Sequence, residues 1–266
     1  MKPRKPRDTA ASVKQRLLNL ARERGEEFNF LLTRYTVERL LYRLAQSNYA
    51  DKFVLKGAML FHLRSVRLPH RPTRDLDLLG YGSPNVNRLE QVFREFCSVH
   101  VVDDGMVFVE HSVRAERIRD EEHYEGVRLH LEARMGSARI PVRVDVGFGD
   151  ALTPSPKREK LATLLDLPAP SMLVCPWETV IAEKFQALVD LGMANSRMKD
   201  FFDLRQMADT LTIAGATLAR AFEATFERRR TPLPASVPAG LSKRVRRELW
   251  EANPMAGFSQ QNAVGF

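Results

Sequence analysis

The spacing of apolar residues divides the chain into a helical beginning, a middle with strand periodicity and a helical end. Apolar residues recur every three or four positions, which predicts helices, at residues 12–24, 37–46 and 86–96. Apolar and polar residues alternate, which predicts strands, within residues 75–80, 106–119, 126–136 and 138–149. Helical spacing returns at residues 177–191, 199–211 and 218–230. This order of elements favours an α+β fold.

Two segments mark changes in this pattern. Residues 53–64, FVLKGAMLFHLR, are apolar on nearly all sides, and we interpret them as a short buried strand or turn that opens into a helix at Gly57. Residues 153–176 contain five prolines and predict a linker that ends the mixed α/β part. We therefore expect three regions: an N-terminal helical segment with a basic tail (1–50), an α/β core (51–152) and a helical C-terminal domain (153–266).

Composition excludes several classes of protein. The 266 residues are 44% hydrophobic and 28% charged, which is typical of a globular protein with a large core. No segment approaches the run of about 20 apolar residues that a membrane-spanning helix needs, and the basic N-terminus lacks the apolar stretch of a secretory signal. Cys97 and Cys175 cannot form a disulfide framework and lack zinc-site spacing. We expect a cytoplasmic protein without a membrane partner.

The positive charge of the chain is concentrated in two segments. The net charge is +8, and residues 1–7 contribute four basic residues and no acidic one. Residues 220–250 contain eight basic residues against three acidic ones, so these two segments together account for the whole excess. A solvated surface explains this pattern, and so does the binding of a polyanion such as nucleic acid.

Three aspartates suggest a metal site. Asp75 and Asp77 alternate with leucines in a predicted strand, so both carboxylates project from one face. A divalent cation with oxygen ligands relieves the repulsion between such carboxylates, although an isolated pair is more typical of a capped or solvated strand end. Asp145 lies on a second predicted strand with the same alternation. Three carboxylates on neighbouring strands could hold the two Mg²⁺ ions used in phosphoryl chemistry.

A lysine and two acids in the helical end form a second candidate cluster. Lys184 lies on the apolar stripe of its helix, where a lysine needs a partner. Asp200 and Asp203 lie three apart on the next helix and lean toward its apolar stripe. A buried ion pair explains these residues without catalysis. Gly57 could open a helix whose N–H groups receive phosphate, but helix packing explains a single glycine more simply.

The combination of these residues resembles the nucleotidyltransferase fold of the DNA polymerase β type. It is most similar to the AbiEii/AbiGii nucleotidyltransferase toxins, which include the MenT toxins. The resemblance spans residues 30–235 and is carried by residues 53–64, RPTRDLDLLG (71–80), RIPVRVDVGFGD (139–150), PWETVIAEKFQALVDLG (176–192) and NSRMKDFFDL (195–204). It implies a polymerase β-type core with a mixed sheet and helices, followed by a helical C-terminal half.

The resemblance also implies roles for the residues of the α/β core. Asp75 and Asp77 match the metal-binding pair for Mg²⁺ or Mn²⁺, and Asp145 matches the third carboxylate. Thr73 occupies the neighbouring hydroxyl position in the nucleotide site. Gly57 matches the glycine of the first motif, but Ala58 follows it where the family more often has a second Gly or a Ser. Backbone contacts to phosphate therefore remain available at Gly57, whereas a hydroxyl contact is lost.

In the helical half, Lys184 matches the lysine that would neutralise the triphosphate of the NTP substrate. Asp200 and Asp203 match the C-terminal acidic motif, in which Asp200 resembles the residue needed for activity. The implied protein is the toxin of a toxin–antitoxin pair. It would transfer NMP from NTP to an RNA acceptor, the 3′ end of tRNA, held by segments 1–7 and 220–250, and so block translation. The alternative is a non-catalytic nucleotide- or RNA-binding module on the same fold.

Overall fold

The computed structural model describes residues 8–64, 75–118, 126–192, 198–236 and 238. The chain divides into two compact units, Met1–Val180 and Ile181–Phe266, and each is described here by itself. The helices of the first unit are α1 (Thr9–Arg24), α2 (Phe28–Ala45), α3 (Met59–Arg64) and α4 (Val86–Cys97). Its strands are β1 (Phe53–Lys56), β2 (Asp75–Gly80), β3 (Val107–Ile118), β4 (Gly126–Met135), β5 (Ala138–Phe148), β6 (Lys157–Lys160) and β7 (Ser171–Val174).

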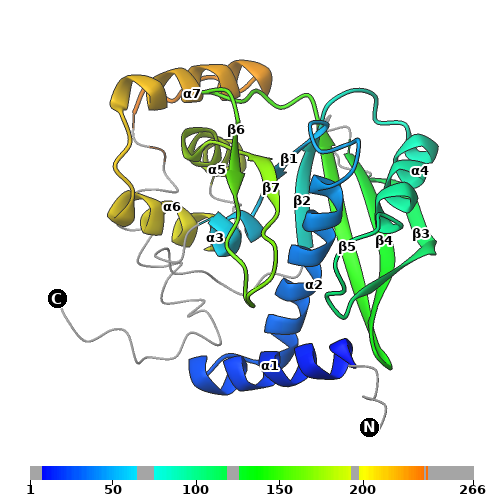
Figure 1. Cartoon of the computed structure of the whole chain (residues 1–266). Helices are drawn as coiled ribbons and strands as arrows, with labels where there is room; N and C mark the ends of the chain where they lie inside the picture. Colours follow the sequence, from blue (N-terminus) through cyan, green and yellow to red (C-terminus); the bar gives the residue numbers. More distant parts are fainter. Residues whose placement is uncertain (1–7, 65–74, 119–125, 193–197, 237, 239–266) are drawn as a thin grey trace, which may run out of the picture. The chain divides into compact units, whose positions relative to one another are not determined.

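The seven strands form one mixed sheet in the order β3-β4-β5-β2-β1-β7-β6. The pairs β2–β5 and β1–β7 are parallel, and the other neighbouring pairs are antiparallel. Figure 1 shows α2 running across this sheet, and α2 contacts β5 and β7. The mixed sheet with helices confirms the predicted α+β class.

Alternation along the central strands separates an apolar face of the sheet from a charged one. Leu76 of β2 lies opposite Val144 of β5, which lies opposite Leu129 of β4, and all three side chains are buried. The next positions along the same strands carry Asp75, opposite Arg143. Because successive side chains of a strand point to opposite faces, burying the leucines and valines leaves the charged residues together on the other face.

The predicted proline-containing linker is wrong for part of its length. Strands β6 and β7 lie within it and extend the sheet beyond β1. Arg64, at the end of α3, forms hydrogen bonds of 2.8 and 2.6 Å with the carboxylate of Glu159 in β6 and donates to the carbonyl of Cys175 at 3.0 Å. These residues therefore extend the seven-stranded sheet and lie in the compact unit that ends at Val180, whereas the predicted domain boundary at residue 152 stays a prediction.

The second unit is helical, as the periodicity predicts. Its described part contains α5 (Trp177–Leu191) from Ile181 onward, α6 (Met198–Thr210) and α7 (Gly215–Arg228). Phe185 of α5 packs against Phe222 and Phe226 of α7, with ring centroids 5.1 and 6.1 Å away. Gln186 donates to the hydroxyl of Thr231 at 2.7 Å, so the chain that follows α7 is also fixed to α5.

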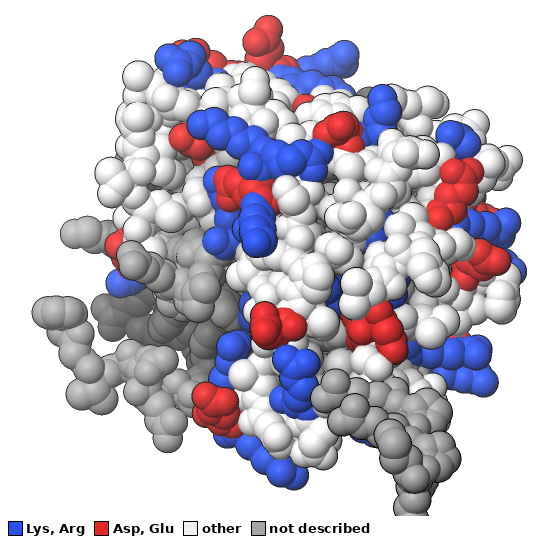
Figure 2. Space-filling view, viewed as in Figure 1, with Lys and Arg blue, Asp and Glu red and all other residues white. Residues whose placement is uncertain are grey.

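Charges of both signs are mixed on the surface seen in Figure 2. Lys and Arg side chains alternate with Asp and Glu side chains over the described residues of this face. Residues 1–7 and 239–250, which carry much of the excess positive charge, lie outside the described part of the chain. The binding of RNA by the basic segments 1–7 and 220–250 therefore stays a prediction. Within the described residues, no helix has both the length and the apolar character needed to cross a membrane.

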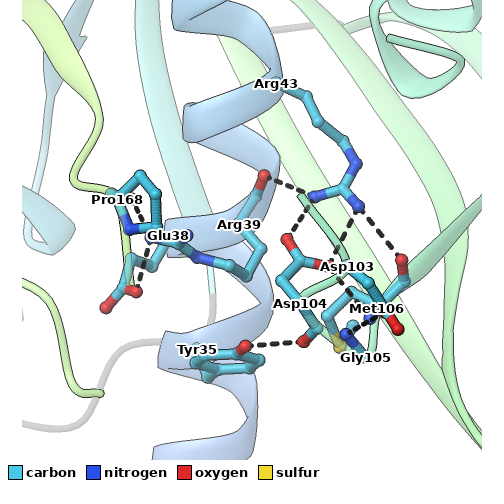
Figure 3. A network of polar contacts seen from close by, with 9 residues as sticks. All are labelled: Tyr35, Glu38, Arg39, Arg43, Asp103, Asp104, Gly105, Met106 and Pro168. Carbon is cyan, nitrogen blue, oxygen red and sulfur yellow. Dashed lines mark hydrogen bonds and ion pairs between the residues drawn. The ribbon is translucent and has the colours of Figure 1, made fainter. Parts of the chain in front are cut away.

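Helix α2 starts at Phe28, nine residues before the predicted start at Val37, and it buries charged residues (Figure 3). The guanidinium of Arg43 makes two hydrogen bonds with the Asp104 carboxylate, of 2.8 and 3.1 Å. Glu38 pairs with Arg39 at 2.8 Å, and both are almost fully buried. Burial raises the pKa of the Glu38 carboxyl despite the neighbouring arginine. Glu38, Arg39 and Arg43 lie within the predicted part of the helix, but their burial is not what an apolar pattern indicates.

Candidate active site

Gly57 and the carboxylate of Asp77 are in close contact. Gly57 follows β1 and has a φ of +68°, a conformation that L residues with side chains rarely adopt. A Cβ atom at this position would lie 1.8 Å from Oδ2 of Asp77. This contact gives a structural reason for the glycine, and the binding of phosphate at Gly57 stays a prediction. Only a glycine here leaves room for the Asp77 carboxylate.

The register of the sheet aligns charged residues in two rows on one face. Asp77 of β2 lies opposite Asp145 of β5, which lies opposite Arg128 of β4. One pleat further, Asp75 lies opposite Arg143, which lies opposite His130. We call this surface the charged face, defined by Asp75, Asp77, Arg128, His130, Arg143 and Asp145. Asp75, Asp77 and Asp145 therefore share one side of the sheet, as their alternation predicts.

Two arginines hold two of these carboxylates. Arg143 donates from Nε and Nη2 to the two oxygens of Asp75, at 2.8 and 2.5 Å. Arg128 donates in the same way to Asp145, with both distances 2.8 Å. The hydrogen bonds to the carboxylates raise the pKa of both guanidinium groups, so both arginines are charged under all ordinary conditions. Such two-point pairs are the strongest geometry available to an arginine and a carboxylate.

Lys56 continues the row of Asp77 on the other neighbouring strand. It lies opposite Asp77 in the pairing of β1 with β2, and its Nζ lies 2.5 Å from Oδ2 of Asp150. Both side chains of this ion pair are nearly buried, with exposed fractions of 11% and 4%. Asp150 follows the end of β5, so the ion pair ties that end to β1. Two cations, Arg128 and Lys56, therefore flank the two adjacent carboxylates of this row.

The oxygen donors of the charged face fit a hard divalent cation such as Mg²⁺. Asp75 and Asp77 project from the same face of β2, and the Asp77 carboxylate lies against Gly57, where any side chain would collide with it. Among the described residues, no three His, Cys, Asp or Glu side chains are already gathered closely enough to hold a metal ion. Arg128 and Arg143 account for the arrangement seen, because they engage Asp145 and Asp75. Asp145 as a metal ligand stays a prediction.

In the second unit, Lys184 forms ion pairs with both predicted acidic residues. Its Nζ lies 2.8 Å from Oδ1 of Asp200 and 2.8 Å from Oδ2 of Asp203. The lysine side chain is 14% exposed and the two carboxylates are 5% exposed. The residue pattern correctly predicts this cluster. Three charged groups so thoroughly removed from water hold α5 and α6 together, whatever further role they have.

The remaining predicted residues divide between the described and undescribed parts of the chain. Thr73 lies outside the described residues. So do residues 1–7 and, within the basic segment 220–250, residues 237 and 239–250. Arg128 and Arg143 are residues of the site that the sequence argument did not select. The signal for Arg143 is present in the sequence, since it lies two residues before Asp145 and so on the same face of β5. Arg128 depends on the register between β4 and β5, which the sequence does not give.

Comparisons with known proteins give a family match and two similar solved structures. A family profile described as nucleotidyl transferase AbiEii toxin of type IV toxin–antitoxin systems matches residues 39–261. A solved structure of a candidate nucleotidyltransferase from H. pylori matches with 15% identity and a TM-score of 0.45, covering 83% of this chain and 90% of that one. JHP933 from Helicobacter pylori matches with 12% identity and a TM-score of 0.42, covering 81% and 93%. No curated protein sequence matches this chain.

Proposed function

Because the chain belongs to the AbiEii family of nucleotidyltransferase toxins of type IV toxin–antitoxin systems, we propose that it transfers NMP from NTP to an RNA acceptor. The acceptor in this proposal is the 3′ end of tRNA, and the modification blocks translation in the cytoplasm. The family also implies an antitoxin that counters the activity. The net charge of +8, concentrated in segments 1–7 and 220–250, supports a polyanionic acceptor held through its phosphate backbone.

The observation that carries the proposal is the charged face. Asp75 and Asp77 share one side of β2, and Asp145 lies opposite Asp77 on β5. In the proposed reaction Asp75 and Asp77 would hold Mg²⁺ or Mn²⁺, and Asp145 would help to hold a second ion or accept the proton of the attacking 3′-hydroxyl. The bound metal would neutralise the charge that develops as pyrophosphate leaves. The absence of a side chain at Gly57 allows the Asp77 carboxylate to lie against the end of β1.

The lysine cluster of the second unit supplies the remaining proposed roles. Lys184 would act as a positive charge on the β- and γ-phosphates, and Asp200 and Asp203 would hold the lysine in position. Their 2.8 Å contacts with its Nζ support this positioning role. Thr73, beside the metal pair in the sequence, would contact the nucleotide through its hydroxyl.

The direct test is incorporation of label into RNA. Purified protein is mixed with total tRNA, Mg²⁺ and each labelled NTP in turn, and label is followed to the RNA 3′ end. We expect incorporation from one or two of the four nucleotides. Asp75→Ala should abolish it, because the variant loses a metal ligand. The matched control is Glu132→Ala, which removes a carboxylate from β4 that pairs with Arg134 and takes no part in the proposed chemistry.

The alternative of a non-catalytic binding module makes a different prediction. In that case no NTP is incorporated into any RNA, and Asp75→Ala binds nucleotide and RNA as the unmodified protein does. Incorporation that Asp75→Ala retains at full rate would contradict the assignment of the site. The presence of the Asp75–Asp77 pair together with Lys184 and Asp200 favours the enzyme, since a module that only binds nucleotide has no need of them all.

A further inference from the structure

We propose that Arg128 and Arg143 are exchangeable counter-ions of the active site. In the metal-free protein they neutralise Asp145 and Asp75, and on substrate binding they release these carboxylates to the metal and bind phosphate oxygens instead. The inference rests on the proposed nucleotidyl transfer. It assigns to the two arginines a direct contact with the phosphates of the nucleotide or of the RNA acceptor.

The geometry of the two pairs suits such an exchange. Each arginine reaches a carboxylate on the neighbouring strand through two N–H groups, at distances of 2.5 to 2.8 Å. The planar fork of a guanidinium fits the two oxygens of a phosphate as well as those of a carboxylate. The Arg143 side chain is 43% exposed and that of Arg128 is 34% exposed. Both can therefore change partner without leaving a buried charge behind.

The balance of charge favours the exchange when a metal binds. Asp75, Asp77 and Asp145 place three negative charges on the charged face, and the two arginines leave a net charge of −1. A divalent cation changes this to +1, which repels the arginines from the carboxylates and attracts phosphate. In this proposal the arginines neutralise the carboxylates while the metal site is empty, and they bind the phosphates of the substrate once the metal is bound.

The first measurement is a titration of Mn²⁺ binding without nucleotide, in which the EPR signal reports the concentration of free Mn²⁺. Arg143→Gln and Arg128→Gln remove a competing cation from a ligand carboxylate, so we expect each to bind Mn²⁺ roughly threefold or more tightly than the unmodified protein. Arg134→Gln is the matched control. Arg134 is a half-exposed arginine of β4 that pairs with Glu132 at 2.6 Å, away from the three aspartates, and its removal should leave Mn²⁺ affinity unchanged.

The second measurement identifies the phosphates that receive the arginines. Calorimetry with Mg²⁺-bound inorganic tripolyphosphate and, separately, filter binding of total tRNA are applied to the same variants. If only the affinity for tripolyphosphate falls, the arginines contact the phosphates of the nucleotide. If only the affinity for tRNA falls, they contact the phosphates of the acceptor. We expect at least one of the two affinities to fall tenfold or more in Arg143→Gln, while Arg134→Gln keeps both.

Two results would overturn the exchange. One is a Mn²⁺ affinity that stays the same or falls in both variants, and the other is unchanged binding of both phosphate ligands. A purely structural pair would instead lower the thermal stability of the variants without tightening Mn²⁺ binding. Asp75→Asn separates this inference from the proposed function. If it abolishes Mn²⁺ binding while the arginine variants bind no more tightly, only the exchange fails. If the unmodified protein and all variants bind no Mn²⁺, the metal site and the exchange fail together.

Discussion

Replacing Lys184 with methionine should loosen the second unit far more than an ordinary substitution of a lysine. Methionine keeps most of the length and apolar contact of the side chain but removes its charge. Asp200 and Asp203, whose carboxylates are 5% exposed, then face each other without the cation that lies 2.8 Å from each of them. The change therefore isolates the electrostatic part of the interaction between α5 and α6.

Breaking a buried ion pair by removing one partner costs about 3–5 kcal/mol, because the other charge stays buried without compensation. Lys184 retains 14% exposure, and water reaching its end reduces the penalty, so we expect about 3 kcal/mol. Asp200→Asn leaves the ion pair of Lys184 with Asp203 intact, so it should lower the free energy of unfolding by only about 1 kcal/mol. Neutralising all three groups together should restore stability to within about 1 kcal/mol, because the mutually paired charges are then removed together.

Hydrogen exchange followed by mass spectrometry can measure this change locally, in peptides covering residues 181–191 and 198–210. A loss of about 3 kcal/mol corresponds to exchange roughly a hundredfold faster in these helices. Peptides from the sheet of the first unit serve as an internal control and should change little. Unchanged protection of α5 and α6 in Lys184→Met would refute the argument, because the lysine would then not be holding two buried carboxylates. Asp200→Asn, which keeps one ion pair, is accordingly the better variant for testing catalysis.

Three further predictions follow from the first unit. Gly57→Ala should lower the free energy of unfolding by at least about 2 kcal/mol more than Gly25→Ala in chemical denaturation, because the two have nearly the same φ but only the first places a methyl group against Asp77; equal losses would contradict this. Burial raises the pKa of the Cys97 thiol to about 12 from 9.0, so the folded state keeps a proton that the unfolded state loses above pH 9. Between pH 8 and 10 the unmodified protein should therefore lose about 1.4 kcal/mol relative to Cys97→Ala, and parallel stability curves would exclude the shift. Arg43→Met should cost about 3–5 kcal/mol by thermal or chemical unfolding, because it leaves a buried carboxylate unpaired; a loss below 1 kcal/mol would show that the pair is not desolvated.

Sequence patterns predict those elements that combine length with a regular period. The strands at 126–136 and 138–149 agree with β4 and β5 within one residue, since ten or more residues give a clear alternation. Strands β6 and β7 have four residues each, too few for a period to be recognised among the prolines. Helix α2 is missed over its first nine residues because Arg34 is buried there and hides the apolar stripe.

The carboxylates of the candidate site are predictable because alternation alone places Asp75 and Asp77 on one face. The same reasoning pairs Lys184 with two acids of the next helix, as the structure shows. Alternation also places Arg143 on the same face as Asp145, but the pairings of Arg143 with Asp75 and of Arg128 with Asp145 could not be predicted in this way. They depend on which strands are neighbours and in what register, and a one-residue slip of β4 against β5 would turn Arg128 to the opposite face.

The place of β1 in the middle of the sheet constrains the order in which this chain can fold as it is synthesised. β1 carries Lys56 and leads into Gly57, and one of its two neighbours, β7, consists of residues 171–174. A growing chain that has not yet reached these residues leaves β1 at the edge of an incomplete sheet, with its N–H and C=O groups open to other strands. Closing the sheet requires contacts between residues more than a hundred positions apart, which slows folding. The backbone that shapes the candidate site is therefore completed only after residues 171–174 have left the ribosome.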